Sequence, residues 1–124
     1  MLLEDLTQRI LKASFQVSNE LGSGFLESVY ENAVLIALRD EGLRASSQVP
    51  LQVLFRGQIV GNFVADLVVE DRILVELKAV KSLAAEHVAQ VLNYLKATKI
   101  EVGLLINFGN PKLEYRRFNN HFDY

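Results

Sequence analysis

The stretch FVADLVVEDRILVELK, residues 63–78, places three charged side chains inside two strongly apolar runs that have the length of β-strands. The charged residues are Asp66, Glu76 and Lys78. Burying a charged group is unfavourable unless it is paired with an opposite charge or coordinates a metal ion. These three residues are therefore the strongest indication in the sequence of what the chain does.

Side-chain parity relates the two carboxylates to each other. Alternate side chains of a strand share a face, so Glu76 and Lys78 point to the same side. The polar residues 70–72 form the expected turn. A three-residue loop there sets Asp66 directly opposite Glu76, whereas a two-residue loop pairs Asp66 with Val75 and separates the carboxylates. The sequence leaves both registers open.

Two interpretations fit a strand pair that carries these charges. Facing carboxylates repel each other, and a bound Mg²⁺ or Mn²⁺ relieves the repulsion because hard cations prefer oxygen ligands. In the alternative, Lys78 neutralises Glu76 at the edge of a sheet and no metal is involved. The first interpretation predicts a divalent-metal phosphodiesterase site, and the second predicts an ordinary hairpin.

The rest of the chain predicts an α/β fold in the order ααβββαββ. Helical spacing of apolar residues runs from Leu3 to Leu21 and from about Leu26 to Glu41. Strands are predicted at residues 48–55, 59–69, 73–78, 102–108 and 113–118. The third helix is predicted at about residues 84–98. Pro50 indicates an edge strand or an irregular start. A strand–helix–strand passage beside a hairpin predicts a mixed central sheet flanked by helices.

Composition limits the class of protein. The chain has 124 residues, half of them hydrophobic, and no cysteine. We therefore expect one domain, residues 1–124, without disulfides or zinc–thiolate sites. No apolar stretch is long enough to span a membrane, and the acidic start MLLEDLTQRI does not resemble a signal peptide. These features predict a cytoplasmic protein with no membrane partner.

The net charge of −2 argues against a protein that coats nucleic acid through bulk electrostatics. The charge is unevenly distributed, however. Residues 1–43 contain three basic and seven acidic side chains, and residues 78–117 contain seven basic and three acidic ones. The basic segment permits contact with phosphates, although such a run is more often an ordinary solvated surface.

Two helices carry further candidates. Glu27 lies in the first turn of the second helix, where the helix dipole favours a carboxylate even without a function. Glu31, one turn later on the same face, is either an accessory acid or an ordinary surface charge. Tyr30 is most simply a core aromatic whose hydroxyl reaches a polar site. On the third helix, His87 and the later Gln90 and Tyr94 share one broad face, which borders a site or is only solvated.

Other catalytic chemistries find little support. His87 and His121 are the only histidines, and neither has the surroundings of a Ser/His/Asp triad. The chain contains no phosphate-binding GxxxxGK[ST] string. His87 could act as a general base near neutral pH. A metal-activated water is preferred, because a carboxylate cluster can generate that nucleophile without histidine.

The motifs together resemble a known family. Gly24, Glu27 and Tyr30 spell GxxExxY, and Asp66, then Glu76-x-Lys78 and Gln90-xxx-Tyr94 follow in order. This combination resembles the GxxExxY family, a branch of the PD-(D/E)xK nuclease-like superfamily, from the first helix to at least Tyr94. The one departure is Ala65, which stands where the superfamily has the proline of its PD pair.

The resemblance implies a restriction-endonuclease-like core and a role for each matching residue. Asp66 and Glu76 would bind Mg²⁺ or Mn²⁺, with Glu27 contributing directly or through water. Lys78 would orient the attacking water or stabilise charge on the phosphate. Gln90 and Tyr94 would support the site or contact substrate. Tyr30 and, from its place on the same helix face as Gln90, His87 are expected as further supporting residues.

Three hypotheses follow for function. The first is a metal-dependent nuclease that acts on DNA more than on RNA. The second is a module that keeps the nuclease fold and binds protein or nucleic acid without cleavage. The third is a purely structural assembly subunit. We also expect a homodimer, because the first helix is apolar enough to form an interface as well as part of the core.

Overall fold

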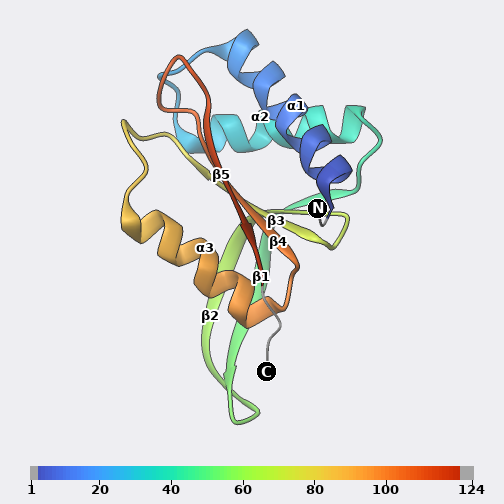
Figure 1. Ribbon diagram of the computed structural model, residues 1–124, viewed down its shortest axis with the longest axis vertical. Helices are drawn as coiled ribbons and strands as arrows, with labels where there is room; N and C mark the ends of the chain where they lie inside the picture. Colours follow the sequence, from blue (N-terminus) through green and yellow to red (C-terminus); the bar gives the residue numbers. More distant parts are fainter. Residues whose placement is uncertain (1–2, 121–124) are drawn as a thin grey trace.

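The computed structural model describes residues 3–120 (Figure 1). Within that range, three helices and five strands follow the predicted order ααβββαββ. Their bounds are α1 Glu4–Leu21, α2 Glu27–Asp40, β1 Ala45–Phe55, β2 Gln58–Val69, β3 Ile73–Lys78, α3 Ala85–Thr98, β4 Val102–Asn107 and β5 Glu114–Asn119. No helix in this part of the chain is both long enough and apolar enough to cross a membrane.

The strands form one mixed sheet in the order β1-β2-β3-β4-β5. The parallel pair is β3 and β4, which α3 connects, and the other three neighbouring pairs are antiparallel. The predicted mixed α/β sheet is confirmed. β1 lies at one edge, as Pro50 indicated, and begins at Ala45, earlier than the predicted start at Gln48.

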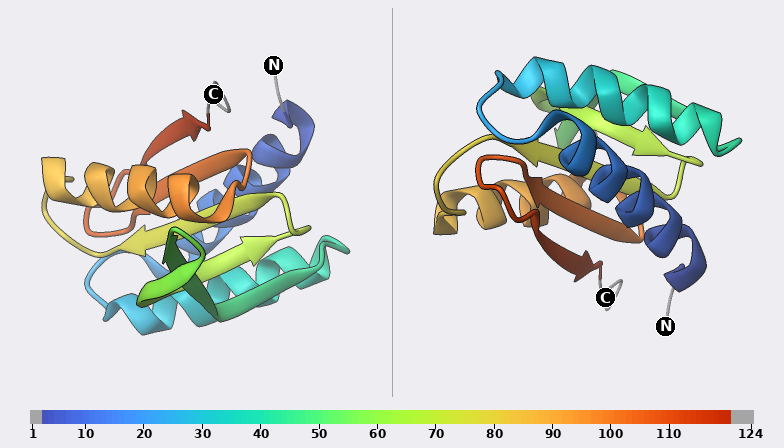
Figure 2. Two further views of the ribbon diagram at one scale, coloured as in Figure 1. Left: turned by 90° about the horizontal axis from the view of Figure 1, so that it is seen from below. Right: turned by 90° about the horizontal axis from the view of Figure 1, so that it is seen from above.

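Helices cover both faces of the sheet (Figure 2). α1 and α2 pack on one face, where the first core joins residues such as Ile10 and Val34 to alternate side chains of β2, β3 and β4. α3 packs on the other face through Val91 and Leu95 in a second core. Gly103 of β4 makes room for α3, since a Cβ there would lie 2.8 Å from Val91 Cγ1.

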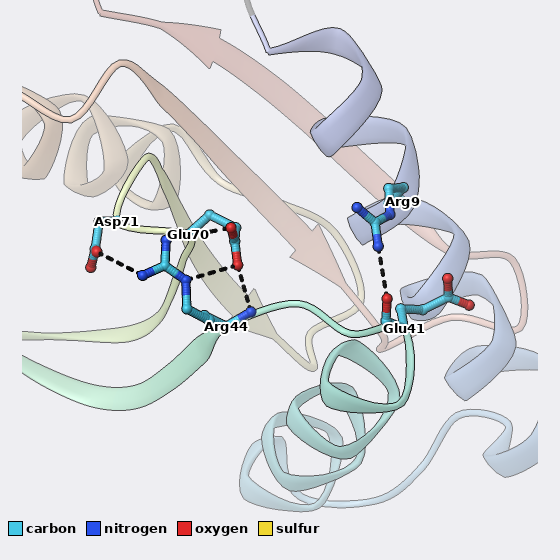
Figure 3. A network of polar contacts seen from close by, with 5 residues as sticks. All are labelled: Arg9, Glu41, Arg44, Glu70 and Asp71. Atoms are coloured by element: carbon cyan, nitrogen blue, oxygen red, sulfur yellow. Dashed lines mark hydrogen bonds and ion pairs between the residues drawn. The ribbon is translucent and has the colours of Figure 1, made fainter.

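The turn between β2 and β3 has three residues, 70–72, and pairs Val69 with Ile73. Glu70 and Asp71 both adopt positive φ, at 53° and 57°. Arg44 holds this turn: its backbone N–H donates to Glu70 Oε2 at 2.6 Å, and its guanidinium contacts both acidic side chains (Figure 3). These contacts lower the pKa of Glu70. The three-residue register is therefore the one that this chain adopts.

The β1–β2 hairpin is longer than the rest of the sheet. β1 pairs with β2 along almost its full length, but β2 pairs with β3 only over residues 67–69. Beyond Leu67, toward its tip, the hairpin leaves β3 and projects from the body of the molecule (Figure 1). The tip exposes large apolar side chains, namely Leu54, Phe55, Ile59 and Val60. The separation of β2 from β3 opens the sheet at one end.

Candidate functional site

Asp66 and Glu76 lie where β2 and β3 separate. The last paired residues, Leu67 and Val75, place Asp66 opposite Glu76 in the same register, as a three-residue loop predicts. The Asp66 N–H donates to Glu76 Oε2 at 2.7 Å, and the Leu77 N–H donates to Asp66 Oδ2 at 2.8 Å. Each carboxylate therefore replaces a backbone carbonyl as the acceptor between the strands. We call this pair of hydrogen bonds the carboxylate clamp.

Glu76 is the most perturbed acid of the site. Its side chain is buried, with only 3% of the residue exposed. Burial and then the neighbouring Asp66 charge raise the pKa of Glu76 to about 8, against the smaller lowering effects of the Asp66 N–H and Lys78. Lys78 therefore offsets only part of what raises the pKa of Glu76.

Lys78 is the last residue of β3 and is half-buried. Its carbonyl accepts the Phe108 N–H at 2.8 Å, which fixes the backbone at the end of the parallel pair. The Lys78 charge lowers the pKa of Glu27 as well as that of Glu76. The amine therefore lies within electrostatic range of acids from two different elements.

A buried asparagine holds the connector that follows Lys78. Asn107, with no exposed surface, accepts the N–H groups of Val80 and Gly109 and donates to the Val80 carbonyl at 2.8 Å. Gly109 passes so close that a Cβ there would lie 1.9 Å from the Val80 oxygen. This packing fixes where the chain turns from β3 toward α3.

α2 brings two acids toward Asp66. Glu27 occupies its first turn, and burial, ahead of the Asp66 charge, raises the pKa of Glu27. Glu31 lies one turn later, and its pKa is also raised, chiefly by burial and also by the charge of Asp66. Gln48 donates to Glu31 Oε1 at 2.7 Å and lowers that pKa. Glu31 therefore belongs to the acidic group.

In the sequence, only the spacing along α2 indicated that Glu31 belongs with the acids. No feature of the sequence indicated a role for Gln48. Glu31 follows Glu27 by four residues, so both lie on one face of α2. Gln48 is an exposed polar residue in a strand, and no pattern in the sequence distinguishes it from Gln52. Only the folded arrangement brings Gln48 to the acids.

Tyr30 supports the site from the core and does not line it. The residue is fully buried and stacks on Phe108, with ring centroids 4.7 Å apart. Its hydroxyl donates to the Gly22 carbonyl at 2.7 Å and accepts the Phe25 N–H at 3.2 Å. The polar group that the hydroxyl reaches is thus the backbone of the loop that precedes Glu27.

α3 lies on the other side of the acids. Gln90 Nε2 donates to the Tyr94 hydroxyl at 3.0 Å, and Phe63 stacks on Tyr94 with centroids 3.9 Å apart. Burial and the charges of Glu76 and Asp66 raise the pKa of Tyr94, so its hydroxyl lies within electrostatic range of the two acids. His87 Nδ1 accepts the Ala84 N–H at 3.0 Å, a contact that holds the start of α3.

The family model of the PD-(D/E)XK nuclease superfamily matches residues 4–118, almost the whole chain. The chain belongs to this superfamily. The match extends past Tyr94 and includes β4 and β5, so the sheet described above is the core of a PD-(D/E)XK domain. The narrower resemblance to the GxxExxY branch stays a prediction.

A solved structure supports the same fold. The protein described as "Crystal structure of SSO0001" superposes with a TM-score of 0.62 over 98% of this chain, at 17% sequence identity. The present chain covers 62% of that one, less than two thirds of its length. No curated protein sequence matches the chain. The structural likeness shows a restriction-endonuclease-like fold, and the chemistry has to be argued from the residues.

PD-(D/E)XK nucleases generally use divalent metal ions. The donor atoms here are of the type that such an ion prefers, because all of them are carboxylate oxygens. They belong to Asp66, Glu76, Glu27 and Glu31. Within residues 3–120, however, no three acidic or histidine side chains are arranged closely enough to hold a metal ion. The carboxylate clamp is one physical reason, since Asp66 and Glu76 each direct one oxygen to a strand N–H.

Proposed function

We propose that this chain is a divalent-metal-dependent nuclease that hydrolyses phosphodiester bonds, with DNA as a better substrate than RNA. The carboxylate clamp is the observation that carries the proposal. It sets Asp66 and Glu76 side by side where the sheet opens, with Lys78 on the same face of β3 as Glu76. At neutral pH a proton on Glu76 relieves the repulsion in this pair, and in a superfamily of nucleases a divalent cation can take the place of that proton.

In this proposal Asp66 and Glu76 hold Mg²⁺ or Mn²⁺, and Glu27 contributes directly or through water. A bound ion of this kind lowers the pKa of its water and polarises a phosphate. Lys78 donates to the phosphate oxygens or orients the attacking water. The effect of its charge on the pKa of both Glu27 and Glu76 supports a place for the amine near these acids. Tyr94 and Gln90 border the substrate path, with His87 on the same helix.

A cleavage assay tests the proposal. Single- and double-stranded DNA and RNA are incubated with the full chain in Mg²⁺, Mn²⁺ or EDTA. We expect metal-dependent cleavage that Asp66→Asn and Lys78→Ala each reduce by about a hundredfold or more. Matched controls are Asp71→Asn, a carboxylate 89% exposed at the turn, and Lys81→Ala, an exposed lysine. Asp66→Asn cleavage at the wild-type rate contradicts the assignment.

A catalytically silent binding or assembly module is the second candidate. The observation that favours it is the absence, within residues 3–120, of a ready metal cluster, together with the structural use of one oxygen from each clamp carboxylate. Calorimetric titration with Mn²⁺ separates the two candidates. Heat that saturates and that Asp66→Asn abolishes supports the nuclease, and no heat at neutral pH supports the silent module.

We also propose a homodimer and a cytoplasmic location, which the sequence predicts. Large apolar side chains exposed at the tip of the β1–β2 hairpin supply a surface that a second copy could cover. Light scattering across a concentration series tests the dimer, and a constant monomer mass contradicts it.

A further inference from the structure

Gln48 has an unusual backbone for a residue in a strand. Its φ is +51°, in the left-handed region that glycine and asparagine adopt most readily. Among the described residues, the other non-glycine positions with positive φ lie at helix ends or turns: Leu3, Arg56, Glu70, Asp71 and Lys99. Gln48 instead stands inside β1, between paired residues on both sides.

The left-handed residue coincides with a change in how the β1–β2 hairpin packs. Before it, Ala45 of β1 belongs to the first core, with α1 and α2. After it, Val49 and Leu51 pack against the second core, with α3. Odd-numbered side chains of β1 thus move from one core to the other at Gln48. The hairpin reorients at the residue that faces Asp66 in the β1–β2 register.

The side chain of Gln48 is directed to an acid of the site. Its Nε2 donates to Glu31 Oε1 at 2.7 Å, and because Gln48 stands opposite Asp66 in the β1–β2 register, this bond brings Glu31 to the strand next to Asp66. A glycine would meet the backbone requirement without strain, so a glutamine at +51° is explained by what its amide does. Strained residues of this kind persist where the surrounding structure holds them, often at functional sites.

We propose that Gln48 is a positioning residue of the nuclease site, whose left-handed backbone keeps its amide on Glu31 and so keeps Glu31 beside Asp66. The inference rests on the proposed metal-dependent function. It adds Glu31 to the side chains that would contact the metal or its bound water. It also explains why Gln48 keeps a positive φ. Gln48 itself touches neither metal nor substrate in this proposal.

A double-mutant cycle on Mn²⁺ affinity tests the inference, with calorimetry as the readout. Gln48→Gly retains the backbone conformation and removes the amide, so we expect it to weaken Mn²⁺ binding by about three- to tenfold. Glu31→Gln should weaken binding to a similar degree. Because both changes break the same Gln48–Glu31 contact, their effects should not add. The double variant should bind Mn²⁺ about as tightly as whichever single variant has the lower affinity. Gln52→Ala, an exposed glutamine of the same strand, should bind as wild type.

Unfolding midpoints separate this role from a merely structural one. Gln48→Gly should unfold at the wild-type temperature or above it, because glycine relieves the positive φ. If Gln48→Gly binds Mn²⁺ as tightly as wild type, or if the two effects multiply in the double variant, the inference is overturned and the proposed function stands. If wild type binds no Mn²⁺, the proposed function fails and the inference fails with it.

Discussion

The two ends of the β2–β3 hairpin are built differently. At the turn end, backbone pairs with backbone from Leu67 to Val69, and Arg44 fastens the turn through Glu70 (Figure 3). At the open end, the carboxylates of Asp66 and Glu76 accept the strand N–H groups in place of carbonyls. The same hairpin thus changes from a regular ladder to a carboxylate clamp within one residue.

The difference shows how a sheet can hold acids without losing its register. The turn end fixes which residues face each other, because slipping by one residue would send Asp66 and Glu76 to opposite faces. The open end then uses that register to bring together two groups that repel. The turn end can be varied at little cost, whereas the open end depends on closely packed neighbours.

The largest expected effect comes from the packing that supports the open end. Gly109→Ala should destabilise the protein by about 3 kcal/mol or more, because the new Cβ would overlap the backbone of Val80 and displace the connector after Lys78. Urea denaturation followed by circular dichroism measures the change.

Gly61→Ala is the matched control for this variant. Gly61 lies in β2, where an added Cβ would have no atom within 4 Å, and it does not have positive φ. We expect its stability to stay within about 1 kcal/mol of wild type. Equal losses for the two variants would mean that the close approach of Gly109 to Val80 does not hold the connector.

The second prediction concerns the charge of Glu76. Its pKa of about 8 in the folded chain exceeds that of an exposed glutamate near 4.5, so the folded state retains a proton that the unfolded state releases between these pH values. The stability contributed by the protonated acid is complete below pH 4.5 and is lost as pH rises through 8. We expect the free energy of unfolding to fall by about 2 kcal/mol or more over this window.

Two comparisons sharpen the pH experiment. Glu76→Gln should remove most of the fall, because glutamine has no proton to lose, whereas Glu20→Gln on exposed α1 surface should retain it. Saturating Mn²⁺ should flatten the wild-type profile, since a cation takes over from the proton. A wild-type profile that is already flat from about pH 5 to 8.5 would show that Glu76 is not held in an unfavourable environment.

The sequence was sufficient for the elements and for the three charged residues of the open end. Asp66, Glu76 and Lys78 interrupt apolar runs, and such an interruption is visible in the sequence alone. The register was not predictable, because the loop contains no glycine and its positive φ values are held by Arg44, 26 residues away from Glu70. A contact that distant leaves no local signal.

The remaining parts of the site depend on three-dimensional detail in the same way. Gln48 reaches Glu31 only because of one backbone angle, and the sequence offers no reason to expect it. The hydroxyl of Tyr30 was expected at a polar site, but the partner turned out to be loop backbone. Sequence patterns identify residues that are out of place, and packing decides what those residues meet.

A third, smaller effect tests the loop that leads into α2 at the open end. Tyr30→Phe keeps the ring on Phe108 and removes the hydroxyl that joins Gly22 to Phe25. We expect a loss of about 1 kcal/mol in the free energy of unfolding. Tyr115→Phe, at a tyrosine 45% exposed, should change stability little. If the two variants are equally stable, the hydroxyl does not anchor the loop.

The smallest effect is expected at the turn end, where Arg44→Ala removes a guanidinium that is 75% exposed. The backbone N–H of residue 44 still donates to Glu70 Oε2, so the turn keeps its shorter hydrogen bond and loses only screened ion pairs. The urea midpoint should fall by less than it does in Tyr30→Phe, and by less still at high salt. Lys112→Ala supplies an exposed control. A fall as large as that of Gly109→Ala would show that the guanidinium, and not the backbone, sets the register on which the carboxylate clamp depends.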